Sequence, residues 1–185
     1  FALLTAISHN LVEAANRTRR GDFSQAGLQG FDLEGKTFGL LGAGHIGRRA
    51  ARIANGYGME TIAYDVAPEP EAAAAWGFRY VALDELYARA DVLSIHLPGN
   101  EKTRDFVSDE AFERMKDGVV VINTARGAVL DVHALLRALS KGKVRAAGLD
   151  VLPEEPTVRE EAELLRRFFA REHDLETLHT DHILL

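Results

Sequence analysis

The sequence of 185 residues predicts an α/β protein in which helices cover both faces of a parallel sheet. Short apolar runs alternate with helical patterns between Thr37 and Leu149, which is typical of parallel strands joined by right-handed crossovers. Several runs are apolar at nearly every position, which indicates strands buried on both faces. We therefore expect one doubly wound sheet, with its ligand site at the carboxyl ends of the strands.

The first expected element is an amphipathic helix from Phe1 to Arg20, which ends at Gly21. Its apolar stripe has the spacing of one helix face and consists of Leu4, Ile7, Leu11 and Ala15. This stripe needs a partner surface. A loop with several glycines then runs to Lys36, before the first strand.

A glycine-rich turn follows the first strand, Phe38 to Leu41. The residues Gly42-Ala43-Gly44-His45-Ile46-Gly47 fit the G-x-G-x-x-G pattern of dinucleotide-binding domains. Gly42 permits the turn, Gly44 lets backbone N–H groups approach a pyrophosphate, and Gly47 lets the next helix lie close to the strand. The free N–H groups of that helix start would face the phosphates.

An acid ends the second strand. After a helix from Arg48 to Tyr57 and a stop at Gly58, the strand Thr61 to Tyr64 leads to Asp65. Dinucleotide-binding domains carry an acid about 20 residues after the glycines, where it accepts hydrogen bonds from the adenosine ribose. Asp65 would repel a 2′-phosphate, and no Arg or Lys follows it up to Glu69. The Rossmann-type sheet is therefore expected to bind NAD rather than NADP.

The remaining elements alternate in the same way. We expect strands at Phe78 to Val81, Asp91 to Ile95, Gly118 to Ile122 and Val144 to Leu149. The expected helices are Pro68 to Trp76, one capped by Asp84 and ending at Arg89, Ser108 to Lys116, and one from Asp131 to about Gly142. Thr157 and Glu160 form a capping box for a helix after Pro156, and Asp174 to Leu185 is also helix-like.

Composition excludes several classes of function. The net charge of −6 and the pI near 5.7 argue against a nucleic-acid partner, which needs a basic face. The absence of Cys excludes disulfides and thiolate chemistry and agrees with a cytoplasmic protein. No apolar run approaches the ~20 residues of a membrane span. No His or acidic pair at ligand spacing has a third partner, so no metal site is expected.

Four motifs in order resemble one family. They are the glycine turn, His96-Leu97-Pro98 with Thr103, Val121 to Gly127 with Asp131, and Gly148 to Val151 with Glu155-Pro156. Together they resemble the NAD-binding domain of the D-isomer-specific 2-hydroxyacid dehydrogenases, which include D-lactate and phosphoglycerate dehydrogenases, over nearly the whole chain. The resemblance implies hydride transfer between a nicotinamide and a small D-2-hydroxy acid or 2-oxo acid.

Two residues carry the catalytic expectations. Arg126 follows the fifth strand, and its guanidinium can hold a carboxylate in two parallel hydrogen bonds, so the resemblance implies that it anchors the substrate. Glu155 is implied as the acid that hydrogen-bonds the catalytic histidine and raises its pKa. Glu154 is its rival, and the spacing to Pro156 favours Glu155.

The resemblance also implies the cofactor contacts. His96 would line the cofactor site rather than act as an acid. The expected cofactor-binding residues are Gly42, Gly44, His45, Ile46, Gly47, Asp65, His96, Leu97, Pro98, Thr103, Thr124, Ala125, Arg126 and Asp150.

The catalytic histidine itself has two candidate locations. His173, His179 and His182 are the late histidines, and Thr180-Asp181-His182 has a superficial likeness to the family's Thr-Pro-His. It has Asp in place of Pro, and no apolar strand precedes it. The alternative is a strand and a histidine just past Leu185.

We expect residues 1–185 to be the NAD-binding domain of a longer enzyme whose substrate domain lies outside this sequence. Residues 1–20 and 172–185 would pack on those other parts, the full protein would be a homodimer, and the domain alone would be inactive. An NADH-sensing, corepressor-like binding module of the same fold is the alternative. An S-adenosylmethionine methyltransferase shares the glycine turn but gives no reason for Arg126 and Glu155.

Overall fold

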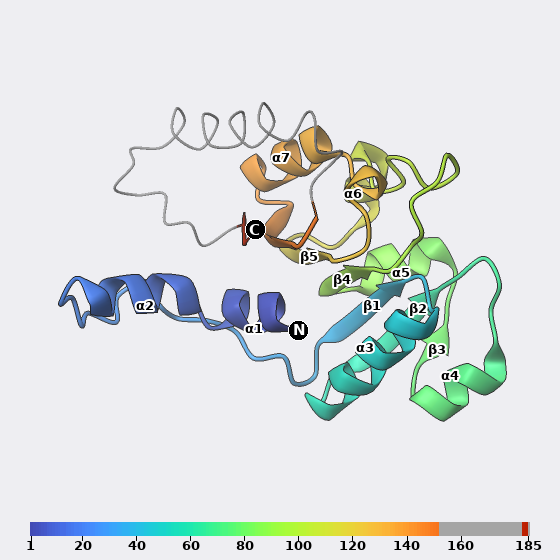
Figure 1. Cartoon of the computed structure of the whole chain (residues 1–185), viewed down its shortest axis with the longest axis horizontal. Helices are drawn as coiled ribbons and strands as arrows, with labels where there is room; N and C mark the ends of the chain where they lie inside the picture. The colour runs from blue at the N-terminus through green and yellow to red at the C-terminus, as the bar shows by residue number, and fades with distance from the viewer. Residues whose placement is uncertain (152–182, 185) are drawn as a thin grey trace.

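The computed structural model describes residues 1–151 and 183–184 and contains one parallel sheet (Figure 1). The strand order is β3-β2-β1-β4-β5-β6-β7, which confirms the Rossmann-type doubly wound sheet. The chain reverses its direction of travel across the sheet between β1 and β4, so the crevice for a ligand opens at their carboxyl ends. The strands are β1 (Thr37–Leu41), β2 (Glu60–Tyr64), β3 (Arg79–Tyr80), β4 (Val92–Ile95), β5 (Val119–Asn123), β6 (Val144–Leu149) and β7 (Ile183–Leu184).

Helices cover both faces of the sheet. One hydrophobic cluster joins the sheet to α1 (Ala2–Ser8), α3 (His45–Gly56) and α4 (Pro70–Trp76). The other joins it to α5 (Leu83–Arg89), α6 (Asp109–Arg114) and α7 (Val132–Ser140). A short 3₁₀ helix, η1 (Gly127–Val129), precedes α7, whose start is capped by the Asp131 carboxylate. The two clusters explain why the central strands are apolar at almost every position.

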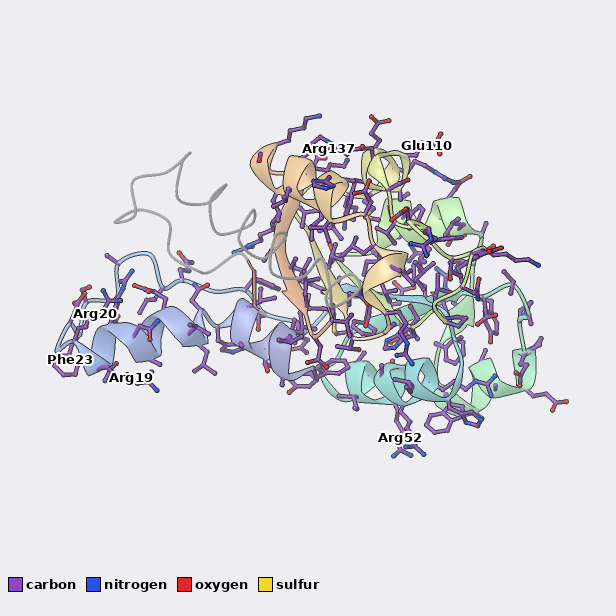
Figure 2. All side chains as sticks on the ribbon, turned by 45° about the horizontal axis from the view of Figure 1, so that its top comes forward. Arg19, Arg20, Phe23, Arg52, Glu110 and Arg137 are labelled. Carbon is purple, nitrogen blue, oxygen red and sulfur yellow. The ribbon has the colours of Figure 1, made fainter. Side chains whose placement is uncertain are left out.

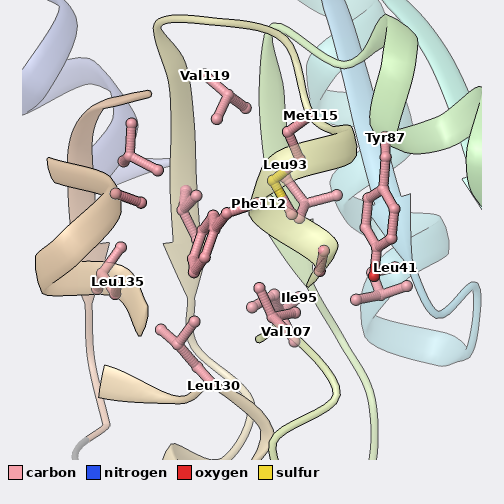
Figure 3. Close-up of a cluster of buried hydrophobic side chains, with 14 of the residues drawn as sticks. Leu41, Tyr87, Leu93, Ile95, Val107, Phe112, Met115, Val119, Leu130 and Leu135 are labelled. Atoms are coloured by element: carbon pink, nitrogen blue, oxygen red, sulfur yellow. The ribbon is translucent and has the colours of Figure 1, made fainter. Parts of the chain in front are cut away.

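The second cluster is the larger core and lies beneath α5, α6 and α7 (Figure 3). Phe112 and Met115 pack against Leu93 of β4, and Leu135 closes the cluster from α7. Full burial of one such side chain contributes about 1.5–3 kcal/mol to stability. This core fixes the ends of β4 and β5, from which the candidate site is built.

The prediction of a single helix from Phe1 to Arg20 is wrong. Asn10 adopts a left-handed conformation with φ of 48° and separates α1 from α2 (Leu11–Arg19). Asn tolerates this conformation better than most residues. Leu4 and Ile7 of α1 are buried against this chain's own sheet, where Gly148 leaves room for Leu3. Beyond the break, α2 extends away from the sheet (Figure 1).

Two further expectations differ from the structure. Asp84 does not cap α5, because the cap position is Ala82 and Asp84 lies in the first turn. Ile183 and Leu184, within the segment expected to be helical, instead pair in parallel with β6. The open edge of β6 offers backbone partners that an isolated two-residue apolar segment lacks. The rest of that segment and the helix expected after Pro156 lie outside the described residues.

Candidate active site

The glycine-rich turn lies at the switch point of the sheet. Gly42 has φ of 98°, and its N–H donates to the carbonyl of Tyr64 at 2.9 Å. A Cβ on Gly42 would lie 2.8 Å from the carbonyl oxygen of His96. The turn therefore contacts the ends of both β2 and β4, and no larger residue fits at its first position.

The other two motif glycines do different things. A Cβ on Gly47 would lie 2.4 Å from the carbonyl oxygen of Gly42, so Gly47 is needed for the turn to close. Gly44 is the N-cap of α3, and a Cβ there would meet nothing within 4 Å. The space around Gly44 at the start of α3 is open, and His45 and Ile46 beside it are exposed, Ile46 by 70%. This open helix N-terminus fits a pyrophosphate.

Asp65 holds the turn as well as facing the crevice. Its Oδ2 accepts a hydrogen bond from the N–H of Ala43 at 2.8 Å, and its Oδ1 accepts from the N–H of Ala67 at 3.0 Å. A carboxylate that already orients the turn stands next to the place where the ribose hydroxyls of a dinucleotide would lie.

Arg48 is a turn contact that sequence reasoning missed. Its Nε donates to the carbonyl of Ala43 at 2.7 Å, and its Nη2 donates to Glu69 Oε1 at 2.5 Å. The hydrogen bond with Glu69 raises the pKa of Arg48. Position 48 follows the motif directly, which was a signal for Arg48, whereas nothing in the sequence links it to Glu69.

His96 sits under the turn at the end of β4. Its N–H donates to the carbonyl of Leu41 at 2.8 Å, and its Nε2 lies 2.9 Å from Ser94 Oγ. Burial lowers the pKa of His96 to about 4. The ring is therefore neutral near pH 7, and a neutral, half-buried imidazole is suited to lining the site rather than to donating a proton.

The loop after β4 is closed by a threonine. Thr103 Oγ1 donates to the carbonyl of Pro98 at 2.5 Å and accepts from the N–H of Asn100 at 3.0 Å. Leu97 packs beside the turn, 3.3 Å from where a Cβ on Gly42 would lie. The Thr103 hydroxyl thus fixes the loop that carries Leu97 and Pro98.

Arg126 lies on a loop that buried Asn123 organises. Asn123 Oδ1 accepts from the N–H of Ala125, and its Nδ2 donates to the carbonyl of Arg126, both at 3.0 Å. The exposed Arg126 side chain donates from Nη1 to the carbonyl of Ala125 at 2.7 Å. A Cβ on Gly99 would lie 2.9 Å from Arg126 Cγ, so Gly99 makes room for the arginine stem.

Sequence reasoning missed Asn123 and Gly99, although both stand inside or beside the motifs. The same asparagine links the next strand, because the N–H of Asp150 donates to the carbonyl of Asn123 at 2.9 Å. Thr124 and Asp150 are both exposed at this end of the sheet. The ends of β5 and β6 are thereby held together with Ala125 and Arg126.

Other expected catalytic residues lie outside the described residues, namely Glu154, Glu155, His173, His179 and His182. Within residues 1–151 and 183–184, no group of three or more His, Asp or Glu side chains is placed to hold a metal ion. Over the same residues, no helix has both the length and the apolar character that crossing a membrane requires.

The sheet order, the open helix N-terminus and the acid after β2 define a dinucleotide-binding domain. The sequence profile of the D-isomer specific 2-hydroxyacid dehydrogenase NAD binding domain matches residues 1–179. The chain therefore belongs to the D-isomer specific 2-hydroxyacid dehydrogenase family and carries its NAD-binding domain. The cofactor is NAD.

Known relatives agree with this family. A glyoxylate reductase of Thermococcus litoralis is 38% identical over 180 residues, which cover 94% of this chain and 54% of that protein. D-lactate dehydrogenase of Escherichia coli is 40% identical over 154 residues, covering 83% of this chain and 46% of the relative. The chain thus spans about half the length of these relatives.

Solved structures of the family have the same fold. The D-lactate dehydrogenase of Aquifex aeolicus, solved with NAD and lactic acid, superimposes with a TM-score of 0.81 at 33% identity. That match covers 99% of this chain and 55% of the other. A pyruvate reductase of Chlamydomonas reinhardtii gives a TM-score of 0.85 at 35% identity, with the same coverage.

Proposed function

We propose that the protein is an NAD-dependent dehydrogenase that transfers hydride between the nicotinamide and C2 of a small D-2-hydroxy acid or 2-oxo acid. The observation that carries this proposal is the exposed guanidinium of Arg126, on a loop at the same end of the sheet as the cofactor turn. Relatives named for glyoxylate, hydroxypyruvate and D-lactate support a substrate that pairs a carboxylate with a neighbouring C2 oxygen.

The chain's own residues would divide the work. Gly44, the start of α3 and Asp65 would hold the dinucleotide, and NAD supplies the hydride acceptor or donor when bound. Arg126 would orient the substrate carboxylate by charge-assisted hydrogen bonds. We propose that Glu155 pairs with a catalytic histidine that donates a proton to the substrate oxygen.

The test is the variant Arg126→Gln in the full-length protein, assayed with glyoxylate, pyruvate and hydroxypyruvate. Loss of the guanidinium's two parallel hydrogen bonds is expected to lower kcat/KM by about 10²–10³-fold. The affinity for NADH should fall by a smaller factor. Arg126→Lys keeps the charge but cannot form two parallel hydrogen bonds, so its kcat/KM should lie between those of the wild type and Arg126→Gln. Arg52→Gln on the outer side of α3 is the control.

Unchanged turnover in Arg126→Gln would contradict the proposed role. NADH binding without turnover of any of these acids by the wild type would instead indicate a nucleotide-sensing module.

We also propose that the full-length protein is a homodimer. The arm formed by α2 and the following loop extends from the sheet and exposes Leu11 by 59% and Phe23 by 79% (Figure 2). Phe23 lies at the tip of this arm, and exposed apolar side chains along it suit a partner surface. Phe23→Ser is expected to shift the dimer toward monomer in light scattering, and a monomeric wild type would contradict the proposal.

A further inference from the structure

The residue Ala43 in the glycine-rich turn is held from two sides. Asp65 accepts from its N–H at 2.8 Å, and Arg48 donates to its carbonyl at 2.7 Å. On its outer side, the Arg48 guanidinium donates a hydrogen bond to Glu69. The Arg48 side chain is 17% exposed and the Glu69 side chain is 62% exposed. Two acids and one guanidinium therefore gather around the same turn, and the guanidinium is already paired.

This arrangement matters for the adenosine end of the cofactor. The acid after β2 faces the ribose hydroxyls of NAD, which are neutral donors. NADP carries a 2′-phosphate there, and a phosphate needs a cation, for which guanidinium is the best side chain. Arg48 is the guanidinium that touches the turn, and Glu69 occupies its outward N–H group.

We propose that Glu69 is a specificity-determining residue that pairs with the outward N–H group of Arg48 and so withholds its guanidinium from a 2′-phosphate. Glu69 and Asp65 together then favour NAD over NADP. The inference rests on the use of a nicotinamide dinucleotide and not on which acid is the substrate.

The pair is suited to this role because it contributes little to folding. Ion pairs with an exposed partner stabilise proteins only weakly, so Glu69 can be replaced without unfolding the domain. The bond from Arg48 Nε to the carbonyl of Ala43 lies on the more buried side, and it keeps the guanidinium in place when Glu69 is removed. The freed N–H groups then remain beside the turn that Asp65 also contacts.

The experiment measures the dissociation constants of NADH and NADPH for the full-length protein by direct titration. In Glu69→Gln, the ratio of the NADPH to the NADH constant should fall roughly five- to tenfold. Glu71→Gln is the matched control, because Glu71 is an exposed acid of α4 and is not among the partners of Arg48. It should leave the ratio unchanged. Thermal unfolding checks that each variant is folded.

A second variant tests whether Arg48 is the group released. In Arg48→Gln combined with Glu69→Gln, the gain in NADPH affinity should disappear. An equal gain in NADPH affinity in Glu71→Gln would show that the effect comes from overall charge. A gain that persists in the double variant would show that Arg48 is not the group released. Either result overturns the inference. A wild type that binds neither nucleotide would instead contradict the proposed function.

Discussion

The turn after β1 and the loop after β5 both lie at the carboxyl ends of the parallel strands, but different contacts hold them in place. Ala43 in the turn is fixed by side chains from other elements, those of Asp65 and Arg48. The loop is fixed from within by Asn123, and the fork of Arg126 is exposed. The cofactor side is therefore preformed by side chains from other elements, whereas the substrate side presents an exposed charged group held only by contacts to its own loop and to Gly99.

The largest expected effect separates two glycines of the turn. Gly47→Ala should destabilise the protein by at least about 3 kcal/mol, because the new Cβ would lie 2.4 Å from a backbone oxygen. Gly44→Ala should leave the unfolding free energy nearly unchanged and weaken NADH binding, since its Cβ meets only open space where the pyrophosphate would lie. Urea unfolding and NADH titration measure the two effects. Equal destabilisation by both variants would show that the turn is not preformed.

The next effect tests the loop after β5. Asn123→Ala leaves the N–H of Ala125 and the carbonyl of Arg126 without their partner and should destabilise the protein by about 2–3 kcal/mol. It should also lower kcat/KM about tenfold, because the backbone of Arg126 is released. Asn123→Asp keeps the acceptor but buries a carboxylate whose second oxygen faces the carbonyl of Arg126, so a loss at least as large is expected. If kcat/KM in Asn123→Ala stayed at the wild-type value, the loop would not depend on Asn123.

The smallest effect concerns His96, which lies between the two regions. Burial lowers its folded pKa to about 4, against about 6.5 in the unfolded chain, so the unfolded state binds the extra proton between these values. The contribution of neutral His96 to the free energy of unfolding is fully present above pH 6.5 and is lost as the pH falls toward 4. From pH 7 to pH 5 the loss is about 2 kcal/mol.

His96→Asn should flatten that part of the stability profile in urea unfolding at pH 7 and pH 5. His45→Asn, at an exposed position, is the matched control. The idea fails if His96→Asn and the wild type lose equal stability over this interval.

Much of the fold was predictable because local patterns determine it. Apolar runs located β1, β2, β4, β5 and β6, and the cap at Asp131 located α7. The break at Asn10 was not predictable, since the apolar stripe continues through it and only the folded chain buries Leu4 and Ile7 while leaving Leu11 exposed. β7 depends on an edge that only the folded sheet supplies.

In the candidate site, too, residues within local motifs were predictable and residues that act through distant contacts were not. The motifs led directly to the turn and to Arg126, because their glycines and their arginine are contiguous with strand ends. Glu69 and Gly99 act through Arg48 and Arg126, which lie 21 or more residues away in the sequence. Such contacts exist only after folding, so no local pattern marks them.

The β3 end of the sheet has a consequence for the protein's behaviour in crowded solution. There the outermost strand has two residues, Arg79 and Tyr80, while the longer apolar strands β1, β4 and β5 lie further inside the sheet. An exposed strand edge is a template for pairing with another chain, and a short edge strand with a charged residue limits that pairing. β3 is therefore expected to lower the tendency of this end of the sheet to form intermolecular β-structure.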